Sequence, residues 1–198
     1  MDPMTAAFDA LADDYDDVHH DAVARALTEA VRPAPDALVA DVACGTGAVA
    51  LILARTRPAT AAPVLAIDLS PAMVARGRER GAGLPVDWRV GDAVPLPVPD
   101  ASLDAILCAS SLHFLGAAAL ADWRRALRPG GRVGFTLPPA AHFHPSGTFA
   151  ALVAEDLPLP RTPADAVTLT HAAGFTDTTA TLADTGTRPT IVTTAVNP

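Results

Sequence analysis

The stretch from residue 38 to residue 55 constrains the fold more than any other part of the chain. Residues 38–43 form an apolar run of strand length, Gly45 and Gly47 then require a tight turn, and residues 48–55 continue with the composition of a buried helix. Asp41 and the glycine turn interrupt what would otherwise resemble a membrane span, so we expect no membrane insertion. A buried strand that turns directly into a helix is the first unit of a parallel α/β sheet.

The same alternation of strand and helix continues along the chain. It predicts helices from about residue 5 and over 17–31, 72–80, 117–127 and 162–174, and strands over 64–67, 86–90, 103–109 and 132–137. Two threonine-rich segments, 176–182 and 190–196, are expected to form an antiparallel hairpin joined through Gly186. The predicted fold is α/β: a Rossmann-like, open, mostly parallel seven-stranded sheet with helices on both faces and an antiparallel C-terminal edge.

Charge and composition exclude several function classes. The formal net charge is -8 and the arginines are scattered, so we expect no binding to nucleic acid, which needs a basic surface. The chain has no lysine, which excludes Schiff-base chemistry and a P-loop. The two cysteines form no CxxC pair, so neither a disulfide framework nor a cysteine zinc site is expected. Without a signal-peptide pattern, a cytoplasmic location is expected.

The glycine turn and an acidic residue further on form the first candidate ligand site. Gly45 and Gly47 allow close approach of a ligand to the backbone, and the following helix N-terminus favours an anionic group. Asp68 ends the next predicted strand, where a carboxylate can accept hydrogen bonds from ribose hydroxyls. The alternatives are a tight turn without a ligand and a helix-capping aspartate, a role that Ser70 already fills. Because the loop through Ala50 also satisfies the loose dinucleotide pattern, an NAD-dependent dehydrogenase stays open at this point.

Five ordered motifs make the assignment more specific. They are Asp-Val-Ala-Cys-Gly-Thr-Gly at 41–47, Ala-Ile-Asp-Leu-Ser-Pro-Ala-Met at 66–73, Gly-Asp-Ala at 91–93, Ser-Leu-Asp at 102–104 and Arg-Ala-Leu-Arg-Pro-Gly-Gly at 125–131. Together they resemble the class I S-adenosylmethionine-dependent methyltransferases, in the branch that includes the ubiquinone and menaquinone methyltransferases. The resemblance covers about residues 8–135. It implies one methyltransferase domain over 1–198, with N-terminal helices (1–35), a cofactor-binding core (36–137), a short lid (138–161) and a C-terminal helix and strands (162–198).

The resemblance also implies the residues that bind S-adenosylmethionine. The methionine part would lie against the first motif and beside the end of the fourth strand, under Tyr15. The ribose would bind Asp68, and the adenine would contact residues after the second and third strands. The implied cofactor-binding residues are Tyr15, Asp41, Ala43, Cys44, Gly45, Gly47, Asp68, Leu69, Met73, Gly91, Asp92, Ala93 and Ser110. Ala43 departs from the family, which often has glycine there.

The acceptor and the catalytic groups are less defined by the sequence. His113 follows the fourth strand and is the candidate general base, although a loop-ordering role is the alternative. With His142 and His144 in the lid, it would line the acceptor pocket. We expect no metal site, because the His-x-His pair has no apparent third ligand. The lid is shorter than relatives commonly have, which leaves the acceptor open.

These observations predict an enzyme that methylates a small-molecule acceptor by in-line transfer. In that reaction, alignment of acceptor and methyl group supplies most of the catalysis. The alternatives are cyclisation of S-adenosylmethionine, a non-catalytic module that binds it, and the NAD-dependent dehydrogenase. The oligomeric state stays open, a homodimer being one option.

Overall fold

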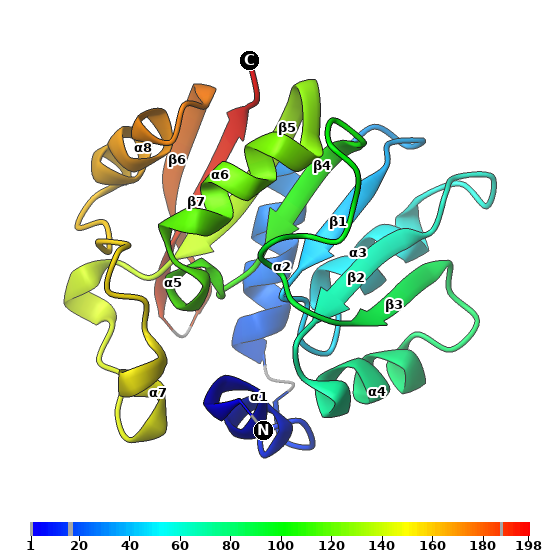
Figure 1. The fold of residues 1–198 in the computed structure, drawn as a ribbon, viewed down its shortest axis with the longest axis horizontal. Helices are drawn as coiled ribbons and strands as arrows, with labels where there is room; N and C mark the ends of the chain where they lie inside the picture. The colour runs from blue at the N-terminus through cyan, green and yellow to red at the C-terminus, as the bar shows by residue number, and fades with distance from the viewer. Residues whose placement is uncertain (1, 16–17, 187) are drawn as a thin grey trace.

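A computed structural model describes residues 2–15, 18–186 and 188–198 and contains one seven-stranded sheet with the strand order β3-β2-β1-β4-β5-β7-β6 (Figure 1). The strands are β1 (Val39–Val42), β2 (Val64–Asp68), β3 (Val86–Val90), β4 (Leu103–Cys108), β5 (Leu127–Leu137), β6 (Thr176–Asp184) and β7 (Pro189–Val196). Strands β1 to β5 pair in parallel, whereas β7 pairs antiparallel with both β5 and β6. The predicted fold class and its antiparallel C-terminal edge are confirmed.

Helices cover both faces of the sheet because the central strands are buried on both sides. The helices are α1 (Pro3–Asp9), α2 (Val18–Val31), α3 (Ala48–Thr56), α4 (Pro71–Arg80), α5 (Leu112–Leu115), α6 (Ala117–Ala126), α7 (Thr148–Leu152) and α8 (Pro163–Ala172), with a 3-10 turn at Ala140–His142. Alternate residues of the central strands face opposite cores. Val39 packs with α2 and α3, whereas its neighbour Ala40 packs on the side of α6 and α8.

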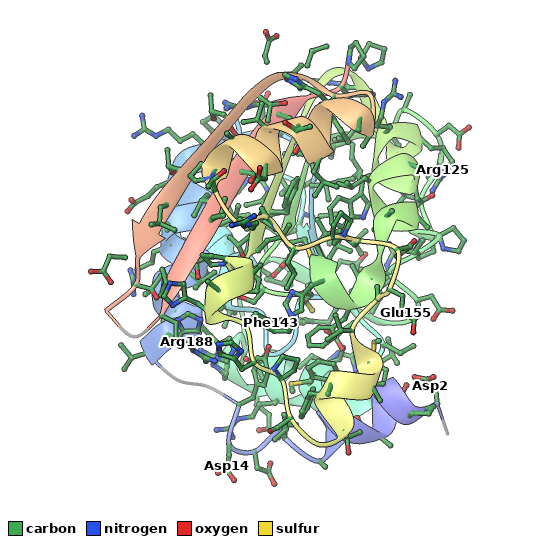
Figure 2. The ribbon with its side chains drawn as sticks, turned by 90° about the vertical axis from the view of Figure 1, so that its left-hand side faces the viewer. Asp2, Asp14, Arg125, Phe143, Glu155 and Arg188 are labelled. Atoms are coloured by element: carbon green, nitrogen blue, oxygen red, sulfur yellow. The ribbon has the colours of Figure 1, made fainter. Side chains whose placement is uncertain are left out.

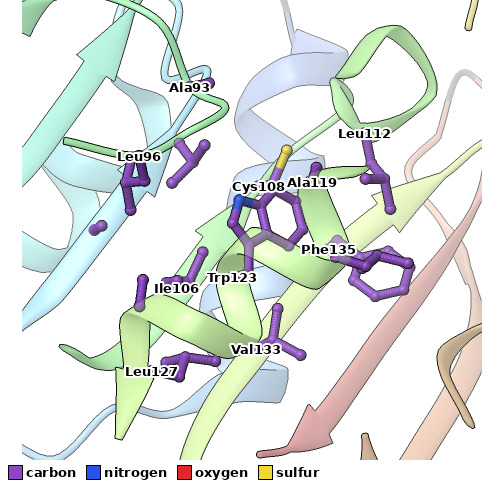
Figure 3. Close-up of a cluster of buried hydrophobic side chains, with 14 of the residues drawn as sticks. Ala93, Leu96, Ile106, Cys108, Leu112, Ala119, Trp123, Leu127, Val133 and Phe135 are labelled. Carbon is purple, nitrogen blue, oxygen red and sulfur yellow. The ribbon is translucent and has the colours of Figure 1, made fainter. Parts of the chain in front are cut away.

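The core on the α6 side is centred on the indole of Trp123. Its side chain is fully buried against Phe135 of β5 and Cys108 of β4 (Figure 3). The other core places Trp88 of β3 against α3 and α4. A Cβ at Gly77 would lie 2.4 Å from the Trp88 ring, and one at Gly47 would lie 2.2 Å from it. Both glycines therefore make room for this indole.

The expected helix and strand boundaries are correct to within a few residues in most elements. Ser70 caps α4 by accepting from the Met73 N–H at 3.1 Å, as its place before Pro71 predicts. Strand β5 begins at Leu127, earlier than the expected residue 132, because Leu127 pairs with Leu103 of β4 and the Gly131 carbonyl accepts from the Asn197 N–H at 2.8 Å. The expected start of the second helix, at residue 17, lies outside the described residues. Helices α5 and α7 were not predicted.

The segments at the two ends of the candidate site come from distant parts of the sequence. Helix α1 lies beside α7, which belongs to the segment between β5 and α8 (Figure 1). Both lie beyond the carboxyl ends of the parallel strands, where ligands bind in open α/β sheets. Among the described residues, no helix has both the length and the apolar character required to cross a membrane.

Candidate functional site

The turn after β1 brings backbone close to the candidate site. Ala43 and Gly45 both have left-handed backbone conformations, with φ of 51° and 53°. The Gly47 N–H closes the turn by donating to the Cys44 carbonyl at 2.8 Å. A Cβ at Gly45 would lie only 3.2 Å from the Tyr15 ring, so a side chain here would crowd the space above the loop. The glycine that the motif requires thus keeps the backbone accessible.

The carboxylate of Asp68 links the ends of β1 and β2. One oxygen accepts from the Gly45 N–H at 2.7 Å and the other from the Ser70 N–H at 2.9 Å. The side chain is buried, and burial raises its pKa, although these hydrogen bonds oppose the shift. Each carboxylate oxygen can accept a further hydrogen bond, so Asp68 is positioned to bind a ligand with two donors.

Asp41 on β1 has a different environment. Its carboxylate is 1% exposed and accepts from the Ala50 N–H of α3 at 2.9 Å. Burial raises the pKa of Asp41 well above its ordinary value. The thiol of Cys44 is also buried, and burial raises its pKa as well, so neither cysteine chemistry nor a reactive thiolate is indicated there.

A cavity of about 450 Å³ opens between these loops and helix α1. Its floor includes six of the residues expected to bind the cofactor, from the turns after β1, β2 and β3: Ala43, Gly45, Asp68, Leu69, Asp92 and Ala93. Tyr15 lines one side of this cavity. The volume of the cavity lies within the range of small-ligand sites in proteins.

Helix α1 forms the cover of this first cavity. Asp2, Met4, Thr5 and Phe8 of this region line it. The carboxylate of Asp9 at the end of α1 accepts from the Ser70 hydroxyl and from the Ala72 N–H at 3.1 Å. These contacts join α1 to the N-terminus of α4, where a negative charge is favourable. The N-terminal helix α1 is therefore part of the site.

A second cavity of about 360 Å³ adjoins the first one. The two share Phe8, Tyr15 and Phe114 as lining residues. The second cavity also contains His113 and His142, as the sequence predicts, and Phe143. Phe143 of the segment after β5 and Arg188 of the β6–β7 connection, both labelled in Figure 2, line the same cavity.

A small hollow of about 20 Å³ lies between the glycine turn and the end of β4. Asp41, Cys44 and Ser110 line it, together with Tyr15. Ser110 has φ of 59°, and its N–H donates to the buried Thr136 hydroxyl at 2.7 Å. A non-glycine residue held in the left-handed region, as Ser110 is here, is often found at functional sites.

Four of the expected site residues lie outside these three spaces. Gly47 packs against Trp88, and Met73 is fully buried within α4. The Gly91 N–H donates to the Asp68 carbonyl at 3.0 Å, which fixes the turn that carries Asp92. These three residues do not line the cavities but hold in place the loops and the helix that do. His144 lines none of the three spaces: the residue is exposed and its ring hydrogen-bonds the Ala141 carbonyl at 3.1 Å.

Sequence reasoning missed the aromatic lining of the second cavity. Phe8, Phe114 and Phe149 come from three short helices whose sequences carry no motif. The available signal was composition, because nine aromatic residues in the whole chain make each one informative. Among the described residues, no group of three or more histidine, cysteine or acidic side chains is placed to hold a metal ion.

Comparison with known proteins gives a consistent result. A family model described as a methyltransferase domain matches residues 39–131. A ubiquinone/menaquinone biosynthesis C-methyltransferase of Caulobacter sp. strain K31 is 37% identical over 145 residues, which are 65% of this chain and 58% of that protein. The nocamycin O-methyltransferase of Saccharothrix syringae is 37% identical over 140 residues, covering 66% of this chain and 49% of that protein. The chain thus spans about half the length of these relatives.

Solved structures share the fold. A SAM-dependent methyltransferase from Aquifex aeolicus has a TM-score of 0.70 at 18% identity, with 100% of both chains covered. A Haemonchus contortus phosphoethanolamine N-methyltransferase, solved with S-adenosylhomocysteine, has a TM-score of 0.68 at 18% identity and covers 88% of this chain and 52% of its own. At this identity the likeness concerns the fold.

Proposed function

The chain belongs to the class I S-adenosylmethionine-dependent methyltransferases, and from this premise we propose that it methylates a small molecule held in the second cavity. The observation that carries the proposal is the pair of adjoining cavities, which share Phe8, Tyr15 and Phe114. A methyl donor in the first cavity and an acceptor in the second would meet at this shared wall. The net charge of -8 argues against a nucleic acid as the acceptor.

The first cavity fits the chemical groups of S-adenosylmethionine. The free acceptor positions of Asp68 suit two ribose hydroxyls, and Leu69 offers apolar contact to a flat base. The exposed carboxylate of Asp92 can accept from an exocyclic amine, while the Ala93 N–H suits a ring nitrogen. The methionine part would extend past Ala43 and Gly45 towards Tyr15, with Asp41 and Ser110 at the small hollow.

The bound cofactor supplies an electrophilic methyl group on a positively charged sulfur. The protein must hold the acceptor in line with the carbon–sulfur bond and exclude water. Phe8 and Tyr15 are placed to shield the junction of the cavities from water. Their rings are arranged edge to face, with centroids 6.5 Å apart. Residues 138–161, which include α7, would form the lid above the acceptor. Alignment of this kind supplies up to about 7–11 kcal/mol in favourable reactions.

Turnover distinguishes this function from its alternatives. The purified chain is incubated with S-adenosylmethionine labelled in the methyl group and a fraction of small metabolites. Label in a new small molecule, with S-adenosylhomocysteine formed in equal amount, supports methyl transfer. Consumption of the cofactor without an acceptor would favour its cyclisation, and binding without any turnover would favour a non-catalytic module. Oxidation or reduction of a nicotinamide cofactor would favour the dehydrogenase.

A further inference from the structure

The second cavity collects most of the aromatic side chains that the protein has. The chain contains six phenylalanines, one tyrosine and two tryptophans, and four of those phenylalanines and the tyrosine line this one cavity. The ring of Phe8 meets Phe149 edge to face at 5.5 Å and Phe114 at 5.7 Å. Aromatic rings arranged around a hollow favour a planar ring as ligand, since stacked and edge-to-face contacts then become available.

His113 supplies a buried polar group within this aromatic wall. Its side chain is 5% exposed, and its ring lies 4.2 Å from the Phe114 ring and 4.8 Å from the Phe143 ring. Within the described part of the chain, His113 Nδ1 has no hydrogen-bond partner. Burial lowers the pKa of His113 to about 4, so the imidazole is neutral at pH 7 and one of its nitrogens is an acceptor. A buried polar group without a partner is a place where a ligand gains a hydrogen bond.

Resting on the methyl transfer proposed above, we propose that the second cavity binds a small planar aromatic compound with a hydroxyl group, and that this hydroxyl donates a hydrogen bond to His113. The volume of about 360 Å³ is near the lower end of ligand sites, which suits one or two fused rings. The product is an aryl methyl ether. This reaction differs from the C-methylation in the name of the Caulobacter relative.

The chemical step balances as follows. The hydroxyl oxygen attacks the methyl carbon, and an oxygen–carbon bond forms as the carbon–sulfur bond breaks. The electron pair of the broken bond stays on sulfur, which leaves as the uncharged thioether of S-adenosylhomocysteine. The hydroxyl proton passes to the imidazole of His113 and then to water. The positive charge of the cofactor is thereby released as a proton, and nothing is oxidised or reduced.

Other titratable groups also face this cavity and belong in the interpretation of any pH profile. They are Asp14 and Tyr15 after α1, His19 and His20 on α2, His142 in the lid and Arg188 before β7. His19 Nδ1 lies 3.0 Å from the Thr185 hydroxyl, and the His20 ring stacks on Tyr15 with centroids 4.4 Å apart. His113 is distinguished from these by its burial and by its contact with both Phe114 and Phe143.

The test measures methyl transfer to 1-naphthol, with benzylamine and cyclohexanol as acceptors that lack either the hydroxyl or the ring. His113→Asn is compared with His171→Asn, the same change at an exposed position on α8. We expect kcat/KM for 1-naphthol at pH 7 to fall at least about tenfold in His113→Asn and to be unchanged in His171→Asn. The difference in kcat/KM between wild type and His113→Asn should become smaller towards pH 10, where the naphthol ionises without a base. Phe143→Leu should raise KM more than it lowers kcat.

Two controls separate this inference from the methyltransferase function itself. The affinity of each variant for S-adenosylmethionine is measured by calorimetry, and it should be the same as that of the wild type. If the wild type methylates benzylamine or cyclohexanol but not 1-naphthol, or if His113→Asn keeps the wild-type rate at pH 7, the inference is wrong and methyl transfer stands. A wild type that binds no S-adenosylmethionine would overturn both.

Discussion

The neutral, buried state of His113 has a consequence for stability that can be measured without any substrate. Burial lowers the pKa of this histidine from 6.5 to about 4 in the folded protein. Between these two values the unfolded chain binds a proton at this position and the folded chain does not, so the free energy of unfolding rises with pH in that range. Stability from this source is fully present above pH 6.5 and is lost as pH falls.

The magnitude follows from the size of the pKa shift. A shift of one pKa unit corresponds to about 1.4 kcal/mol, so the whole effect is about 3 kcal/mol. Between pH 7.5 and pH 5.5, where most carboxylates stay ionised, the loss is about 1.4 kcal/mol. A histidine with an unshifted pKa would lose nothing over this interval.

Urea unfolding followed by circular dichroism at both pH values measures this loss in the wild type and in His113→Gln. Other groups titrate equally in the two proteins and cancel in the comparison. We therefore expect the difference in unfolding free energy between wild type and variant to change by about 1.4 kcal/mol between the two pH values. A difference that stays constant would refute the neutral, buried histidine, and His171→Gln serves as the exposed control.

Three further substitutions test the loops and glycines around the site. Ala43→Gly should stabilise the fold by about 0.5–1 kcal/mol in thermal unfolding, because Ala43 has φ of 51°; a loss of stability would argue against this conformation. Gly77→Ala should lower the free energy of unfolding by about 1–3 kcal/mol, because the added Cβ meets the Trp88 ring, and by little in a Trp88→Leu background. An equal loss of stability in both backgrounds would contradict this packing. Arg125→Ala should lower the free energy of unfolding by about 1–3 kcal/mol, because the guanidinium donates to the Leu96 and Val98 carbonyls at 2.9 Å each. An unchanged urea midpoint would show that these hydrogen bonds contribute nothing to stability.

The parallel core could be predicted because its signals are local. The buried strands β1 and β2 are apolar except for one aspartate each, and a glycine turn or a capped helix follows within a few residues. The residues of the first cavity follow from this, since the carboxyl ends of parallel strands meet along one edge of the sheet. Asp68 was placed correctly by its position at the end of a strand.

The second cavity could not be predicted in the same way. Phe8, Phe114 and Phe149 lie on helices of 7, 4 and 5 residues, which are too short for a recognisable apolar period. Arg125 on α6 likewise has the sequence context of a solvated helix residue. Its guanidinium nevertheless holds the β3–β4 connection, by pairing with Asp100 and by donating to the Leu96 and Val98 carbonyls. Contacts of this kind depend on tertiary packing, which local sequence does not encode.

Titration calorimetry with S-adenosylmethionine, S-adenosylhomocysteine and NADH tests the central claim most directly. The wild type should bind both sulfur compounds and not NADH. Asp68→Asn should weaken that binding about 10- to 100-fold, since charge-assisted hydrogen bonds contribute about 1.5–3 kcal/mol. Asp87→Asn, at a half-buried position of β3 outside the first cavity, should leave it unchanged. Binding of NADH alone, or equal affinity in wild type and Asp68→Asn, would contradict the assignment of the first cavity to S-adenosylmethionine.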